Sequence, residues 1–236
     1  MPFTFAHPAI VLPLVKYLRR YVSATGLIIG TMLPDFEYFI RMHLQSDYSH
    51  TVWGVFLFDL PLGVALAFIF HNLVRDSLIG QLPAYFHHRF ARFAGFDWNG
   101  YFARNKLVVV ISFLIGIFSH ILWDSFTHVS GFFAGHIPLL QSAVMDIPVY
   151  KLLQHASTLL GFIFILLYIH KLTTLEHRKH HRPDIRYWAV WANMALFILG
   201  VWYVLQPAFY VGHFIAAAIS AVLLSLILVS LLWKFR

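Results

Sequence analysis

Five hydrophobic stretches constrain this chain more than any other feature, and they cover residues 52–73, 107–127, 152–172, 187–205 and 212–232. A helix needs roughly 20 apolar residues to cross the hydrocarbon core of a bilayer. Backbone groups inside a bilayer must be satisfied within the protein, and none of the stretches alternates with the period of two that a barrel strand shows. The sequence therefore predicts an all-α integral membrane protein, a helical bundle with about five transmembrane helices.

Composition excludes several classes of protein. Of the 236 residues, 60% are hydrophobic and only 11% are Asp, Glu, Lys or Arg, whereas a soluble domain carries about 25% charged residues. A soluble enzyme and a nucleic-acid-binding module are therefore excluded, and we expect no nucleic-acid partner. The chain has no Cys, which removes thiolate catalysis and Cys-based metal sites. Little sequence is left outside the hydrophobic stretches, so we expect a single membrane domain over residues 1–236.

The Lys and Arg residues between the stretches predict the topology. Five lie in residues 74–106 and four in 173–186, whereas 128–150 and 206–211 contain none. The positive-inside rule then places the two basic segments and the C-terminus in the cytoplasm, and the two segments without basic residues on the outer side.

The same count places residues 1–50 on the outer side. We expect a helical region there, with two short helices over about 8–20 and 23–33 that lie in, or dip into, the outer interface. The alternative is a sixth span over residues 10–33. That span would hold Lys16, Arg19 and Arg20 near its centre, which costs several kcal/mol in a bilayer.

Polar residues gather at the outer end of the second stretch. His120, Asp124 and His128 are spaced four residues apart. Each such step turns a helix by about 40° and rises about 6 Å, so the three side chains share one stripe. A His and a carboxylate one turn apart can bind a metal ion together. In the alternative, His120 and Asp124 pair only with each other and hold helices together.

Further polar residues are expected on the same side. The topology places His50, His155 and His213 at the outer ends of other stretches. His7, Asp35 and Glu37 precede the first stretch; an ordinary interfacial histidine and a helix cap are the alternatives for these positions.

Several motifs resemble an uncharacterised family of bacterial multi-pass membrane proteins that carries a domain of unknown function. They are MPFTFAHPA at residues 1–9, PDFEYF at 34–39, SH at 49–50 and SHILWDSFTH at 119–128. The resemblance implies a multi-pass protein of the bacterial inner (cytoplasmic) membrane. With the topology above, the polar site would face the periplasmic or extracellular side.

The order of the polar residues is also similar to that of inner-membrane metal-dependent hydrolases and, more distantly, of the zinc-dependent phospholipases C. That resemblance implies metal ligation by His7, Asp35, His50, His120 and Asp124, with catalytic or orienting roles for Glu37, His128 and His155. Nitrogen and oxygen donors without sulfur suit Zn, with Mn or Fe as alternatives. The chain begins with Met-Pro and has no His-x-x-x-Glu after residue 128. One or two ions are therefore expected, and not the three-zinc cluster of the phospholipases.

The leading hypothesis is a metal-dependent hydrolase that acts on a lipid or lipid-linked phosphoester at the outer face, with membrane lipids as its partners. The apolar segment 131–150 would then lie as a lid on the outer leaflet. One alternative is a non-enzymatic accessory protein or transporter with a structural His/Asp metal site. Another is an amide hydrolase of the membrane ceramidase type, in which Ser119 or Ser125 would position the nucleophile.

Overall fold

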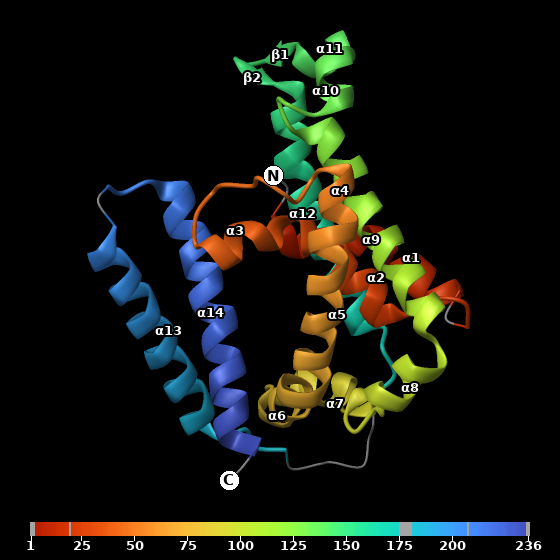
Figure 1. Cartoon of the computed structure of the whole chain (residues 1–236), viewed down its shortest axis with the longest axis vertical. Helices are drawn as coiled ribbons and strands as arrows, with labels where there is room; N and C mark the ends of the chain where they lie inside the picture. The colour runs from red at the N-terminus through yellow and green to blue at the C-terminus, as the bar shows by residue number, and fades with distance from the viewer. Residues whose placement is uncertain (1–2, 19, 175–180, 207, 235–236) are drawn as a thin grey trace. The chain divides into compact units, whose positions relative to one another are not determined.

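The computed structural model is mainly helical and describes residues 3–18, 20–174, 181–206 and 208–234 (Figure 1). Five helical segments are long and apolar enough to cross a membrane: Val52–Gln81, Lys106–His136, Val149–His170, Ile185–Leu205 and Val211–Lys234. Each overlaps one of the five predicted stretches, and the first two extend further toward the C-terminus. The predicted all-α fold is therefore confirmed, and the five segments indicate a multi-pass membrane protein. In the basic segment 173–186, residues 175–180 lie outside the described residues.

The first two of these segments are composite. The first joins α4 (Val52–Gly54), α5 (Leu60–Ile69) and α6 (Arg75–Gln81) through π-helical turns at Val55–Asp59 and Phe70–Val74. The second joins α9 (Lys106–Thr127) to the short α10 (Phe132–His136). The other three are the single helices α12 (Val149–His170), α13 (Ile185–Leu205) and α14 (Val211–Lys234).

Short elements fill the connections. Between α6 and α9 lie α7 (Ala84–Phe90), a 3-10 turn (Ala91–Phe93) and α8 (Trp98–Arg104). Between α10 and α12 lie α11 (Pro138–Gln141) and the strands β1 (Ala143–Val144) and β2 (Ile147–Pro148). The two strands pair antiparallel, with Val144 opposite Ile147. This small hairpin is the one piece of sheet within the described residues.

The N-terminal region is helical, as predicted. It contains a 3-10 turn (Thr4–Ala6), α1 (Pro8–Tyr17), α2 (Ala24–Gly30), a second 3-10 turn (Leu33–Asp35) and α3 (Phe36–Arg41). The helices α1 and α2 are shorter than the predicted 8–20 and 23–33. Ser23 caps the start of α2, because its side-chain oxygen accepts a hydrogen bond from the Gly26 amide.

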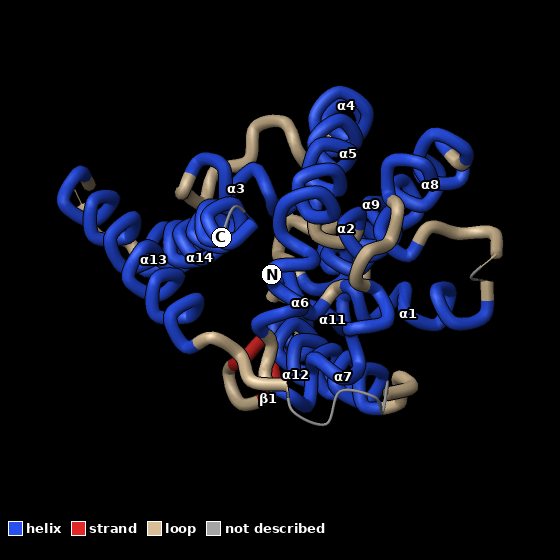
Figure 2. Tube along the Cα trace, turned by 90° about the horizontal axis from the view of Figure 1, so that it is seen from below, coloured by secondary structure: helices blue, strands red, loops and turns tan. Residues whose placement is uncertain are grey.

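The chain forms two compact units. Unit 1 consists of Met1–Asp35, Tyr48–Val64 and Asn105–Lys171, and unit 2 consists of Phe36–Asp47, Ala65–Arg104 and Leu172–Arg236. Within unit 2, α13 and α14 lie side by side in both views (Figures 1 and 2). Ser220 on α14 is buried and donates a 2.6 Å hydrogen bond to the carbonyl oxygen of Phe39 at the end of α3. The single membrane domain expected from the sequence stays a prediction.

Within unit 1, α2 packs closely on the middle of α9. A side chain added at Gly30 would place its Cβ 2.6 Å from the carbonyl oxygen of Phe113, and one added at Gly116 would place it 2.6 Å from that of Leu27. Glycines at such positions let two helix backbones approach each other, which is the usual basis of helix association in membranes. Leu27 and Phe113 are fully buried here. This contact holds the end of α2 beside the polar residues of α9.

Candidate metal centre

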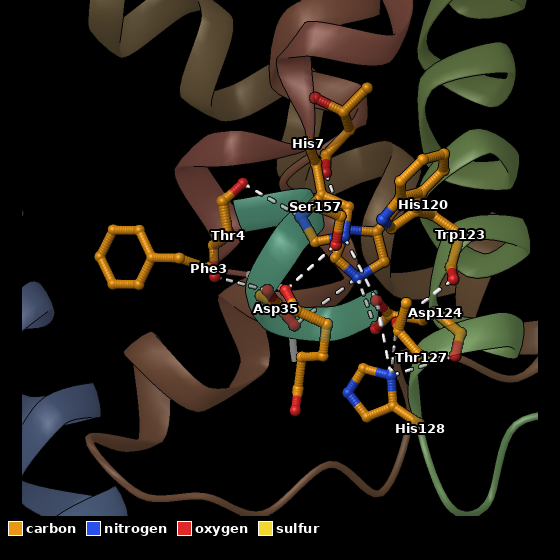
Figure 3. Close-up of polar contacts among 12 residues, drawn as sticks. Phe3, Thr4, His7, Asp35, His120, Trp123, Asp124, Thr127, His128 and Ser157 are labelled. Atoms are coloured by element: carbon orange, nitrogen blue, oxygen red, sulfur yellow. Dashed lines mark hydrogen bonds and ion pairs between the residues drawn. The ribbon is translucent and has the colours of Figure 1, made fainter. Parts of the chain in front are cut away.

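Four separate segments of unit 1 bring polar side chains together at the C-terminal part of α9. Figure 3 shows His7, Asp35, His120 and Asp124. His7 lies at the junction of the first 3-10 turn and α1, and Asp35 ends the second 3-10 turn. His50 lies in the turn before α4, and α9 contributes His120 and Asp124. The two α9 residues are one turn apart, as their spacing predicted.

Four of these residues form a group that could hold a metal ion. Asp35, His50, His120 and Asp124 each offer one ligand atom, and these atoms all lie within 4.8 Å of one another. Nε2 of His120 is 3.6 Å from Oδ1 of Asp35 and 3.3 Å from Oδ2 of Asp124. Nε2 of His50 is 4.0 Å from the same Asp124 oxygen. All four residues were predicted ligands, and the fold brings them together.

Backbone carbonyls fix the orientation of two histidines. Nδ1 of His120 lies 2.8 Å from the carbonyl oxygen of Thr31, and Nδ1 of His7 lies 3.3 Å from that of Thr4. A carbonyl only accepts hydrogen bonds, so Nδ1 carries the proton in both rings. In a neutral imidazole, Nε2 is then a bare lone-pair donor, which is the arrangement found in most metal-bound histidines.

In both rings, Nε2 faces a carboxylate oxygen of Asp124. Nε2 of His7 lies 3.2 Å from Oδ1, and Nε2 of His120 lies 3.3 Å from Oδ2. Two lone-pair atoms repel each other unless a proton or a cation lies between them. Protonating both rings would place two positive charges face to face, because the rings of His7 and His120 stack with centroids 4.0 Å apart. A metal ion resolves the repulsion without that clash of charges.

The buried charge balance also fits a cation. Asp35 and His120 are fully buried, and Asp124 is 8% exposed. Oδ2 of Asp35 accepts a 2.5 Å hydrogen bond from the Thr4 hydroxyl. Oδ1 of Asp35 and Nε2 of His120 have no hydrogen-bond partner among the described residues. Two carboxylates buried together are costly unless protons on the neighbouring imidazoles or a cation compensate them. The donor set therefore fits a metal ion.

His50 is held in an uncommon backbone conformation. Its φ angle is 66°, in the left-handed region that few residues other than glycine adopt. Burial lowers the pKa of His50 below its usual range. A lowered pKa favours the neutral ring, which is the form that binds metals. Strain of this kind persists where the surrounding structure imposes it, and such residues cluster at functional sites.

His128 lies beside the group at the end of α9. Its Nδ1 is 3.1 Å from the carbonyl oxygen of Asp124 and 3.6 Å from Oδ1 of the same residue. Its buried Nε2 has no hydrogen-bond partner within the described residues. The side chains of His128 and His50 are 23% and 28% exposed, respectively. These two residues mark the side on which the group opens to the surface.

Three other predicted site residues have different surroundings. Glu37 belongs to unit 2, where its carboxylate binds the Arg41 side chain, the Ser46 hydroxyl and the Asp47 amide. These contacts organise the loop after α3 and lend no support to catalysis by Glu37. His213 also lies in unit 2, and its Nδ1 accepts a 3.0 Å hydrogen bond from the Leu44 amide.

His155 is exposed on α12. Among the described residues, no hydrogen bond or ion pair joins it to the metal-binding group. The catalytic or orienting roles expected for Glu37 and His155 therefore stay predictions.

Two threonines at the group were missed from the sequence. Thr4 uses its hydroxyl for Asp35 and its carbonyl for His7, and Thr31 uses its carbonyl for His120. Thr4 belongs to the motif that contains His7, so its role could have been predicted from the sequence. The role of the Thr31 carbonyl could not, because every residue type has a backbone carbonyl.

These features define a multi-span helical membrane protein with a buried His/Asp group that could hold a metal ion. Residues 1–231 match the family described as "Domain of unknown function (DUF4184)", so the chain belongs to that family. The predicted membership of an uncharacterised family is confirmed. No curated protein and no solved structure matches the chain.

Proposed function

We propose that this protein is a metal-dependent hydrolase that acts on a lipid or lipid-linked phosphoester at the outer face of the membrane. The observation that carries the proposal is the placement of Asp124 between two imidazoles. Each of its oxygens faces the Nε2 of a ring whose Nδ1 is held by a backbone carbonyl. Outer contacts that fix imidazole ligands in this way are a regular feature of metal sites in proteins.

The residues of the group would hold the ion together. Asp35, His50, His120 and Asp124 would be ligands, and His7, whose Nε2 faces the other oxygen of Asp124, would be a further ligand. Zn suits nitrogen and oxygen donors of this kind, with Mn or Fe as alternatives, and one or two ions fit the donor set. A bound ion of this type lowers the pKa of a coordinated water and polarises a phosphoryl oxygen.

His128 would accept the proton of the attacking water. It lies beside Asp124, is partly exposed and keeps its Nε2 unprotonated when Nδ1 donates to the Asp124 carbonyl. A neutral imidazole in that position can accept a proton from an attacking water and return it to the leaving oxygen. Because its Nδ1 is held by the backbone of a ligand residue, the ring is oriented by the metal-binding group itself.

Exposed apolar residues next to the group support a lipid substrate. They follow His128 directly in unit 1 and are exposed by 76% at Val129, 65% at Phe132, 69% at Leu139 and 92% at Met145. Soluble proteins rarely expose such a patch, whereas lipid-facing proteins do. A phosphoester head group at the metal and an acyl chain along this segment would suit one amphipathic substrate.

The burial of the group favours a second candidate function, a structural metal site. Asp35 and His120 have no exposed surface, and the donors come from segments far apart in the chain. An ion bound there would tie the N-terminal region to α9 without any turnover. Metal would then raise the thermal midpoint of the protein and support no hydrolysis.

The two functions are separated by one set of measurements on purified protein in lipid nanodiscs. Metal content is measured by elemental analysis, and phosphate release is measured from phospholipid and from a lipid-linked phosphate. We expect a stoichiometric transition metal and hydrolysis that a chelator abolishes and the metal restores. His128→Gln should keep the metal and lose the hydrolysis. Metal without hydrolysis of any phosphoester would support the structural site, and absence of metal would contradict both.

A further inference from the structure

The N-terminal helices α1 and α2 form a hairpin that runs deep into unit 1. Gly26 of α2 contacts α9 at Val109 and Ser112, whereas Gly30 contacts it at Phe113 and Gly116. The two helices therefore run in the same direction. The Ser23 amide, just before α2, donates a 2.8 Å hydrogen bond to the Ser112 hydroxyl. Ser112 is twelve residues before Asp124, which corresponds to about 18 Å along the helix axis.

The other helix of the hairpin, α1, runs opposite to α2, away from the metal-binding group. It begins at His7, which lies against Asp124, and α1 then packs along α12. At its far end, Lys16 lies near Tyr168, two residues before the end of α12. The turn between α1 and α2 therefore lies near the first turns of α9 and the last turn of α12. That end of unit 1 is opposite to the metal-binding group.

The hairpin is too short to be a pair of transmembrane helices. The two helices have 10 and 7 residues, whereas a span needs roughly 20. Non-spanning segments are tolerated at membrane depth where they are buried against protein, as α2 is against α9. The hairpin thus has the form of a re-entrant segment that enters and leaves on the side of the metal-binding group.

The turn of the hairpin carries a basic and aromatic surface. Lys16 and Arg20 are exposed, and Tyr17 and Tyr21 are exposed by 74% and 76%. Lys106 and Lys171 are exposed at the same end of α9 and α12. Tyrosines and basic residues are typical of the membrane–water interface, and clusters of basic residues bind anionic lipid head groups. No carboxylate is present between residues 1 and 34 to neutralise them.

We propose that the α1–α2 hairpin is re-entrant and that its turn binds anionic phospholipid head groups at the membrane interface opposite to the metal-binding group. The residues that bind are Lys16, Tyr17, Arg20 and Tyr21. This proposal is independent of the proposed hydrolase, and it departs from the expectation that residues 1–50 lie wholly on the outer side. It explains why the basic residues of the N-terminal region are gathered in the turn between α1 and α2, where the hairpin would reach the opposite membrane interface.

The sidedness of the turn can be tested with single cysteines, because the chain has none of its own. Leu18→Cys labels the turn, and Ser142→Cys, exposed beyond α11, labels the other end of unit 1. An impermeant maleimide should modify the two positions from opposite sides of sealed, oriented vesicles. Modification of both from the same side would overturn the re-entrant hairpin. Tyr21→Cys repeats the test if the Leu18 variant does not fold.

Lipid binding can be tested with a nitroxide on Leu18→Cys in nanodiscs. The label should be less mobile in phosphatidylcholine with phosphatidylglycerol than in phosphatidylcholine alone, and high salt should reverse the change. The double substitution Lys16→Gln with Arg20→Gln should abolish it. Lys151→Gln, at the other end of α12, should retain it. Equal mobility in both lipids, or a response to free inorganic phosphate as large as to the anionic lipid, would overturn the proposal.

Discussion

Nε2 of His7 lies 3.2 Å from Oδ1 of Asp124, although 117 residues separate the two in the chain. This contact joins the first turn of the protein to the end of α9. Nδ1 of His7 already donates to the Thr4 carbonyl. Nε2 can therefore hold the Asp124 oxygen only through a second proton or a metal ion. The N-terminal motif and the α9 motif are therefore parts of one site.

Asp124→Asn is the most direct test of the metal centre. The change keeps the shape of the side chain but removes the negative charge that faces both His7 and His120. We expect the metal content of the purified protein to fall well below that of the wild type. Asp146→Asn is the matched control, since Asp146 is an exposed residue in the β1–β2 turn. A full metal complement in Asp124→Asn would exclude this residue as an essential ligand.

Thr4→Val tests the outer contact of Asp35. The valine keeps the branched shape but removes the hydroxyl that donates to Oδ2 of Asp35. Loss of such a contact lowers metal affinity by roughly 10–100-fold, so a competition titration with a chelator should show a change of that size. Thr174→Val, at an exposed position, should leave the affinity unchanged. An unaltered affinity in Thr4→Val would mean that Asp35 does not depend on this hydroxyl.

Gly116→Ala tests the close packing of α2 on α9. The added Cβ would lie 2.6 Å from the Leu27 carbonyl oxygen, so the helices must separate. Overpacking of this kind costs about 1–3 kcal/mol, and the thermal midpoint should fall. Metal affinity should fall as well, because the Thr31 carbonyl that orients His120 follows α2. Gly135→Ala has no atom near its new Cβ and should be nearly neutral in both measurements.

His128→Gln separates proton transfer from metal binding. Glutamine retains a polar side chain but cannot accept a proton as imidazole does. We expect an unchanged metal content and a loss of phosphoester hydrolysis of roughly 10²–10⁴-fold, the usual contribution of a general base. His136→Gln, exposed on α10, serves as the control. Hydrolysis at the wild-type rate in His128→Gln would remove His128 from the reaction.

The sequence by itself determined the class of the protein and the local parts of the site. Stretches of about 20 apolar residues leave a chain no alternative to helices in a bilayer. The spacing of His120 and Asp124 fixed their common face, because residues four apart on a helix lie one above the other. Both are local properties, and both are set by the geometry of a single helix.

Only the tertiary structure decided which of the remaining polar residues join that face. Asp35 reaches α9 because α2 packs against that helix through Gly30 and Gly116. His7 and His50 join from other segments, also over long sequence separations. Glu37 follows Asp35 by two residues, yet its carboxylate is bound by Arg41, Ser46 and Asp47 in the other unit. Side-chain direction and helix packing settle such choices, and neither is encoded in the spacing of residues along the chain.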